Sequence, residues 1–230
     1  MARHVGKAGA GVKAMARKRT AELLVQGLLL LALGFLLTRW LAHTWFWYFF
    51  GLGLMWSAVV MWGDRATWAP VERAIRGAGG EERVAKALSS LPDGYVVFHD
   101  VLCPVGNIDH IVVGPAGVFL IEAKSHRGEI TVSPEGELLR DGRPFEKNVL
   151  SQVWRETRWL KETLESHLGR RVYVHPFLVF SHGLVKVHGA VRGVMVLPAD
   201  RVVGVIEERP ERLTEKEISE MEKVLTNRLA

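Results

Sequence analysis

Residues 108–124, IDHIVVGPAGVFLIEAK, decide the fold of this 230-residue chain. Two apolar, β-branched runs flank Gly114-Pro115-Ala116-Gly117, a pattern that predicts a β-hairpin. If Pro115 and Ala116 are the central turn residues, the numbers of opposed residues sum to 231, as 115 and 116 do. A three-residue loop with Gly117 in a left-handed conformation would instead shift the register by one residue.

Three charged residues in this hairpin predict a site for phosphodiester chemistry. In the two-residue register Asp109 lies opposite Glu122, at the roughly 5 Å spacing where like charges destabilise a sheet. Lys124 shares that face because it lies two residues beyond Glu122. Carboxylates in so apolar a segment predict a cation between them. Mg²⁺ or Mn²⁺ would bind a scissile phosphate and acidify the attacking water, while the Lys124 ammonium offsets charge in the transition state.

The rest of the domain predicts an α/β fold with a mixed central sheet flanked by helices. Helical spacing covers residues 81–90, 147–167 and 214–229, the last with Thr214 and Glu217 in a capping box. Strand patterns cover residues 95–101, 108–113, 118–121, 129–132, 137–140, 172–180, 191–197 and 202–206.

Two apolar runs precede this domain and predict a transmembrane helical hairpin. In residues 23–37 only Gln26 interrupts the first run, and residues 45–62 (WFWYFFGLGLMWSAVVMW) carry no charge. Each run with its flanks is long enough for a bilayer span. A cleaved signal peptide is the alternative for the first run, but no small-residue cleavage site follows it. The two spans would bring the chain into contact with lipid and could support an oligomer.

The charge distribution sets the expected orientation and domain boundaries. Residues 1–20 hold six Lys and Arg and no acid, whereas the chain from residue 63 onward holds 23 basic and 24 acidic residues. The positive-inside rule therefore predicts that both termini and the α/β domain are cytoplasmic, at an inner or plasma membrane. We divide the chain into a basic tail (1–20), the hairpin (21–63), a linker (64–80) and the α/β domain (81–230).

Four sequence motifs resemble the nuclease-related domain (NERD) family, a branch of the PD-(D/E)xK nuclease superfamily. They are Gly80-Glu81-x-x-Val84, Asn107-Ile108-Asp109-His110, Gly114-Pro115-x-Gly117-Val118-Phe119-x-Ile121-Glu122-x-Lys124, and Gly128. The resemblance covers residues 77–180 and implies a restriction-endonuclease-like core. Asn148 is usually followed by Pro in the family, and here Val149 follows it.

The resemblance also implies a role for each site residue. Asp109 and Glu122 would be metal ligands, Lys124 the catalytic lysine, and Glu81 the helix-borne acid that completes the metal site. Gln152 would contact substrate, or a water molecule in the outer shell of the metal site. Either Glu81 or Glu82 could point inward from the first helical turn, and only the family spacing selects Glu81.

Two functions remain open from the sequence. The first is a membrane-anchored, Mg²⁺-dependent nuclease that hydrolyses nucleic acid, with DNA favoured over RNA. The second is a non-catalytic, membrane-tethered binding or scaffold module, which the near-neutral charge of the domain favours mildly because non-specific DNA binders are usually basic. The single cysteine, Cys103, excludes an internal disulfide and a multi-thiolate metal site. No Walker loop, HExxH motif or nucleophile elbow is present.

Overall fold

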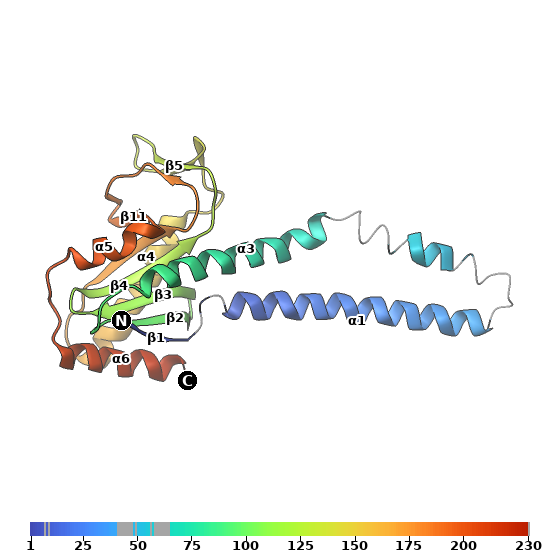
Figure 1. Ribbon diagram of the computed structural model, residues 1–230, viewed down its shortest axis with the longest axis horizontal. Helices are drawn as coiled ribbons and strands as arrows, with labels where there is room; N and C mark the ends of the chain where they lie inside the picture. The colour runs from blue at the N-terminus through green and yellow to red at the C-terminus, as the bar shows by residue number, and fades with distance from the viewer. Residues whose placement is uncertain are drawn as a thin grey trace. The chain divides into compact units, whose positions relative to one another are not determined.

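The computed structural model describes the chain apart from residues 7, 9, 41–47, 49, 56, 58–64 and 230 (Figure 1). It contains two compact units. The first comprises Met1–Ala10 with Gly77–Ala230, and the second comprises Gly11–Arg76. All of the predicted site residues belong to the first unit.

A seven-stranded mixed sheet forms the centre of the first unit. Its strand order is β1-β2-β3-β4-β8-β11-β10. The strands are β1 (Arg3–Val5), β2 (Val96–Cys103), β3 (Gly106–Gly114), β4 (Gly117–Lys124), β8 (Val174–Phe180), β10 (Ala190–Val191) and β11 (Val194–Pro198). The β2–β3–β4 meander is antiparallel, whereas β8 runs parallel to both β4 and β11. A smaller sheet has the order β7-β6-β5-β9, from Arg143–Pro144, Leu138–Arg140, Glu129–Val132 and Leu184–Val185.

Helices cover both faces of the large sheet, as the sequence predicts. On one face α4 (Val149–Leu168) and α6 (Glu215–Leu229) pack over a core that includes Phe98 and Leu120. On the other face α3 (Arg65–Leu88) and α5 (Val202–Glu207) pack over a second core that includes Phe119. A short 3-10 helix, Ala199–Arg201, leads into α5. The fold is therefore a mixed α/β fold with a helical layer on each side.

Local signals for helix starts are confirmed. The Thr214 hydroxyl accepts a hydrogen bond from the Glu217 backbone N–H (3.4 Å), and the Glu217 carboxylate accepts one from the Thr214 backbone N–H (2.8 Å). This is the reciprocal capping box. Asn148 caps α4 by accepting a hydrogen bond from the Ser151 backbone N–H, so Val149 begins the helix without disturbing it.

The hairpin register is also confirmed. Gly114 pairs with Gly117, and the ladder continues to the pair His110 and Ile121. The numbers of each pair sum to 231, so Pro115 and Ala116 are the two central turn residues and the bulged alternative is wrong.

Two sequence expectations differ from the structure. Residues 202–206 were expected to be a strand but form α5, because Val202 and Ile206 are spaced by four and both are buried against the same core. The expected linker at 64–80 is helical from Arg65 onward and continues without a break into the helix that carries Glu81.

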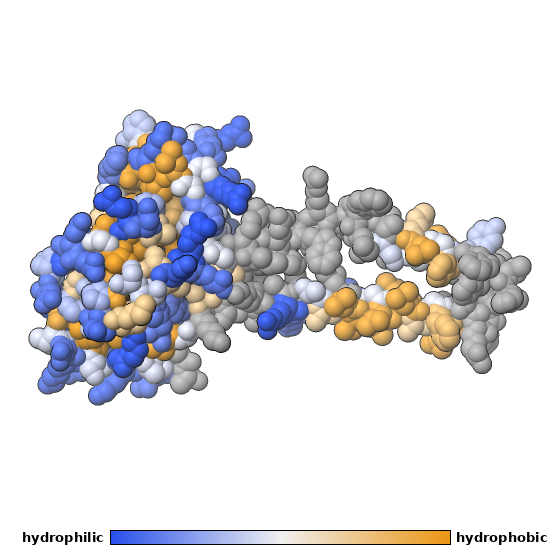
Figure 2. Space-filling view, in the orientation of Figure 1, coloured by the Kyte–Doolittle hydropathy of each residue, from blue (hydrophilic) through white to orange (hydrophobic). Residues whose placement is uncertain are grey.

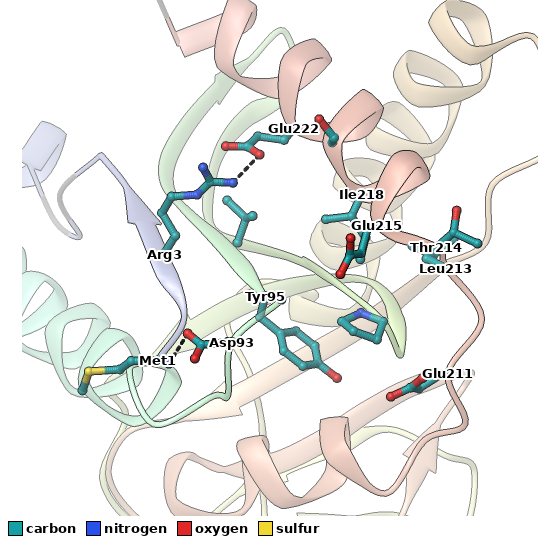
Figure 3. Close-up of a pocket in the computed structure, with 14 residues that line it drawn as sticks. Met1, Arg3, Asp93, Tyr95, Glu211, Leu213, Thr214, Glu215, Ile218 and Glu222 are labelled. Carbon is teal, nitrogen blue, oxygen red and sulfur yellow. Dashed lines mark hydrogen bonds and ion pairs between the residues drawn. The ribbon is translucent and has the colours of Figure 1, made fainter.

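The basic tail predicted for residues 1–20 contains a short strand in the structure. Arg3–Val5 form β1, which pairs in parallel with β2 at the edge of the large sheet. Arg3 forms an ion pair with Glu222 of α6 at 2.5 Å, and the terminal amine lies 2.5 Å from Asp93 (Figure 3). Ala2 is buried, and its N–H donates to the carbonyl of Leu91. A strand this short and basic has no alternating apolar pattern that would predict it. It forms because it pairs with β2 at the edge of the sheet.

In the second unit, α1 (Ala10–Trp40) contains the first apolar run. Within the part of the chain that the structure describes, no helix is long and apolar enough to cross a membrane, so the predicted hairpin has no support from the structure. Most of the second run, 45–62, lies outside the described residues. Leu28, Leu29, Leu30 and Leu31 of α1 are each more than half exposed. The space-filling view shows apolar surface along this helix (Figure 2).

Candidate active site

The charged hairpin residues gather where β3 begins and β4 ends. The Asp109 carboxylate accepts a hydrogen bond from the backbone N–H of Ala123 at 2.7 Å, which ties it to β4 beside Glu122. The Asp109 carboxyl group is buried, although the residue as a whole keeps some exposed surface. Glu122 is almost fully buried, with 3% of its surface exposed. The hairpin therefore brings two carboxylates from neighbouring strands to one end of the sheet.

Lys124 and Gln152 form a hydrogen-bonded network with Glu122. The Lys124 ammonium lies 2.5 Å from Glu122 Oε1 and donates to Gln152 Oε1 at 3.2 Å. Gln152 Nε2 in turn donates to the same Glu122 oxygen at 2.8 Å. Gln152 lies in the first turn of α4, and its amide fixes the orientation of both charged groups. The structure thus brings Gln152 to the hairpin carboxylates across 28 to 30 residues of sequence.

A further buried acid, Glu156, is hydrogen-bonded to this network. Glu156 was not predicted as a site residue from the sequence. It lies one helical turn after Gln152, whose Nε2 donates to Glu156 Oε1 at 3.0 Å. Only 1% of its surface is exposed. Burial, followed by the nearby Glu122 charge, raises the pKa of Glu156 to about 8. The sequence pattern that could have identified Glu156 is its position four residues after Gln152. This spacing places both residues on the side of an amphipathic helix that faces the sheet.

Glu81 approaches the site from α3, on a different layer. It is buried, whereas its neighbour Glu82 is exposed, as the predicted choice of Glu81 requires. Gly80 permits the close approach of α3 to the strand ends. A Cβ added there would lie 2.7 Å from Ser125 Cβ and 2.8 Å from Ser181 Oγ. The glycine thus holds Glu81 near the end of β4.

The electrostatics of the four acids reveal an excess of negative charge. Burial, then the charges of Glu122 and Glu81, raise the pKa of Asp109 well above its ordinary value. Burial disfavours the charged form of Lys124, but the carboxylates of Glu122 and Asp109 outweigh that effect and raise its pKa. One lysine does not balance four carboxylates, so protons remain on some of them.

These donors suit a hard divalent cation by their chemistry. Glu122 Oε2 and Glu156 Oε2 are buried and make no hydrogen bond within the described residues. An anionic oxygen of this kind is a ligand that Mg²⁺ and Mn²⁺ favour, and a cation would displace the protons held by Asp109 and its neighbours. As placed, however, no three His, Cys, Asp or Glu side chains among the described residues form a group that could hold a metal ion. The metal site stays a prediction.

A chain of three histidines lies near this site and was not anticipated. His4 Nδ1 and His99 Nε2 are 2.8 Å apart, and His99 Nδ1 and His110 Nδ1 are also 2.8 Å apart. His4 belongs to β1, and its ring stacks on that of His99, with centroids 5.1 Å apart. His99 and His110 are both buried. Burial, and the adjacent imidazoles, lower the pKa of His99 to about 4 and that of His110 to about 3. The chain is neutral and connects the N-terminal strand to the residue next to Asp109.

Comparison with known proteins identifies the part of the chain that carries this site. Residues 76–181 match the nuclease-related domain (NERD) family. The search of curated proteins and the search of solved structures found no match. The matched segment extends from the helix that carries Glu81 to just past the end of β8, and it includes Asp109, Glu122, Lys124 and Gln152. A nuclease-like function is therefore indicated for this part of the chain.

Proposed function

We propose that the chain is a metal-dependent nuclease that hydrolyses phosphodiester bonds of nucleic acid, DNA in preference to RNA. The observation that carries this proposal is the buried network of Glu122, Lys124 and Gln152 beside Asp109, within the segment that matches the nuclease-related domain. The sheet with helices on both faces is consistent with the restriction-endonuclease-like core that the resemblance implies.

Asp109, Glu122 and Glu81 would hold a Mg²⁺ or Mn²⁺ ion. When bound, the ion would neutralise charge on the scissile phosphate and acidify the attacking water. The polypeptide supplies the rest of the site. Glu122 is held by Gln152 and Lys124, so its carboxylate is oriented before substrate arrives. Such preorganisation lowers the cost of reaching the transition state.

Lys124 supplies positive charge where the phosphate becomes more anionic. Its raised pKa keeps the ammonium charged at neutral pH, and the network fixes it beside Glu122. Gln152 is the residue we assign to positioning and substrate contact, because it bridges Lys124 and two carboxylates. Removal of Lys124 should therefore affect rate more than metal affinity.

The decisive experiment is a cleavage assay on the full chain in mild detergent. Linear and circular DNA and single-stranded RNA are incubated with Mg²⁺, Mn²⁺ or EDTA. The full chain is needed because a fragment that begins at residue 64 would lose β1 and expose the edge of β2. We expect cleavage of DNA that requires the metal and is lost in Asp109→Asn. Undiminished cleavage by Asp109→Asn would place the activity elsewhere.

The alternative is a binding or scaffold module without catalysis. The near balance of 23 basic and 24 acidic residues from residue 63 onward favours it over a general DNA binder. Nucleic-acid binding without cleavage of any substrate, with metal present, would make this alternative the better one.

We further propose that residues 21–63 anchor the domain to an inner or plasma membrane, with both termini cytoplasmic. Four consecutive exposed leucines, 28–31, point in all directions around a helix, since successive residues differ by about 100°. Phe50, Leu52, Leu54 and Met55 of the second run are also exposed. Such a surface suits lipid, or helices of other copies in an oligomer.

Fractionation and protease protection test the anchor. The chain should remain with membranes after alkaline extraction, and protease added outside right-side-out vesicles should leave the C-terminal domain intact. Release of the chain by alkali would contradict the membrane anchor. Digestion of the C-terminal domain by protease added outside would contradict the proposed orientation.

A further inference from the structure

A cavity of about 470 Å³ with cationic side chains at its rim lies at the end of β8, the strand that pairs with β4. Buried residues Phe180, Ser181 and Ala199 form its floor. Arg83 and Lys86 of α3 project at its exposed rim. Its remaining lining residues are Ala87, Gly183, Pro198 and Asp200, the single acid.

The backbone that lines this cavity is joined to the backbone of the catalytic lysine. Phe180 is the cross-strand partner of Lys124, and the Ser181 N–H donates to the Lys124 carbonyl at 3.0 Å. Helix α3 supplies Glu81 to the carboxylate cluster and Arg83, two residues later, to the cavity. The cavity and the carboxylates therefore adjoin the same strand ends and the same helix within one domain.

Positive charge is concentrated around this cavity. The Arg83 guanidinium donates to the Ser181 carbonyl at 3.0 Å, which holds it over the cavity floor. Lys86 lies one turn further along the same helix face. His182 lies nearby, and burial, then the charges of Arg83 and Arg127, lower its pKa. Arg127 therefore adds a third cation to this region.

The location of these cations matters because the domain as a whole is not basic. A near-neutral domain that acts on a polyanion needs local cations where the strand lies. The larger pocket of about 880 Å³ near Arg3 is an unsuitable place, since Asp93, Glu211, Glu215 and Glu222 line it (Figure 3). That pocket also contains Pro115, at the opposite end of the β3–β4 hairpin from the carboxylates.

We propose that Arg83 and Lys86 bind a backbone phosphate of the nucleic-acid strand that flanks the scissile bond. The inference rests on the proposed nuclease function and adds the site that holds the substrate. The guanidinium and the ammonium hold the phosphate over Ser181, and this contact positions the neighbouring phosphodiester at Asp109, Glu122 and Lys124. Because the contact is to phosphate, it contributes affinity independent of sequence.

The test measures the salt dependence of DNA binding by the full chain. A fluorescein-labelled oligonucleotide is titrated at 50–200 mM NaCl, and Glu122→Gln is present in every protein to prevent cleavage. The double variant Arg83→Gln, Lys86→Gln is compared with the matched control Lys216→Gln, Lys223→Gln, which removes two exposed lysines from α6. The basic segment 1–20 is unchanged throughout, so its contribution cancels.

Loss of the one phosphate contact should reduce the slope of log K against log salt by about 0.7 to 0.9. Between 50 and 200 mM salt, the affinity of the Arg83/Lys86 variant should therefore fall about threefold less than that of the parent, while the control follows the parent. Lys86→Gln alone changes one exposed side chain and should give about half of the effect on the slope, even if the double variant is unstable.

A parent-like slope in both the double and single variants would overturn the inference. If the native chain still cleaves DNA in that case, the nuclease function stands and only the phosphate site is wrong. If the parent binds no nucleic acid and the native chain cleaves none, the nuclease function fails and the inference fails with it.

Discussion

The buried histidine chain contributes folding free energy that is lost in mild acid. His99 keeps a folded-state pKa of about 4, against an ordinary value of 6.5. As pH falls below 6.5 the unfolded chain takes up a proton that the folded His99 does not, so unfolding is favoured. The loss begins at pH 6.5 and is complete near pH 4, where the folded protein also binds the proton.

The magnitude follows from the width of that window. Each pH unit of difference corresponds to about 1.4 kcal/mol, so His99 alone removes about 3 kcal/mol of folding free energy by pH 4. Small domains have about 5–15 kcal/mol of stability in total, so this loss is large. His110 acts in the same direction, since its folded pKa is also lowered, to about 3.

His99→Gln tests this reasoning, because glutamine can donate and accept a hydrogen bond but does not titrate. Free energies of unfolding are measured by denaturant titration at pH 7.5, 6.5, 5.8 and 5.0. The wild-type free energy should fall by about 1.4 kcal/mol per pH unit more than that of the variant below pH 6. His188→Gln removes an exposed histidine and should follow the wild type.

Parallel curves for wild type and His99→Gln would refute the prediction. They would mean that His99 takes up its proton equally well in the folded state, and so that β1 does not cover a neutral, buried histidine chain. The test does not depend on the absolute stability of the variant. Only the difference between the slopes of unfolding free energy against pH measures proton uptake by His99.

Four further substitutions test other parts of the site. Glu122→Gln should abolish cleavage in gel assays but leave the metal-free melting temperature unchanged or slightly raised, because one of several repelling carboxylates is removed; a lower melting temperature would contradict the repulsion. Lys124→Ala should retain Mg²⁺ binding in calorimetry but lower the cleavage rate by roughly 10²–10³, as expected for loss of one transition-state contact. Loss of Mg²⁺ binding would show that Lys124 supports the metal site instead. The pKa of Glu156 is raised from 4.5 to about 8, so its ionisation should cost the metal-free wild type about 1.4 kcal/mol per pH unit, relative to Glu156→Gln, as pH rises through this window. Wild-type and Glu156→Gln free energies that change equally between pH 6 and 8 would show that Glu156 is ionised in the folded state. Gly80→Ala should destabilise the fold by about 1–3 kcal/mol, because the added Cβ would lie too close to Ser125 and Ser181. Gly79→Ala is the control and should stabilise the helix slightly, because the space around Gly79 is open. Equal melting temperatures for the two variants would contradict the close approach of α3 at Gly80.

Much of the domain could be predicted from local pattern. The hairpin of β3 and β4 forms because two β-branched runs flank a turn whose residues suit a two-residue loop, and its register then fixes Asp109 beside Glu122. The capping box at Thr214 and the amphipathic repeat of α4 are equally local. In each case the energy that selects the structure comes from residues a few positions apart.

Other features depend on contacts that a local pattern does not contain. A strand and a short helix both suit the β-branched residues of α5, and the choice is made by the core that buries Val202 and Ile206 together. In the sequence, Glu156 is not distinguishable from other charged helix residues. Its environment is set in the folded protein by Gln152 and Glu122. Its raised pKa is a property of that surrounding and not of the helix.

The sequence by itself determined the hairpin, its register and the three charged residues that it carries, because side-chain alternation and turn chemistry act over a few residues. Only the tertiary structure placed β1 at the sheet edge, assembled the histidine chain from His4, His99 and His110, and brought Arg83 to the cavity beside Lys124. These pairings join residues separated by 11 to 95 positions along the chain. Their free energy comes from burial and hydrogen bonds that exist only after the sheet and its two helical layers have formed.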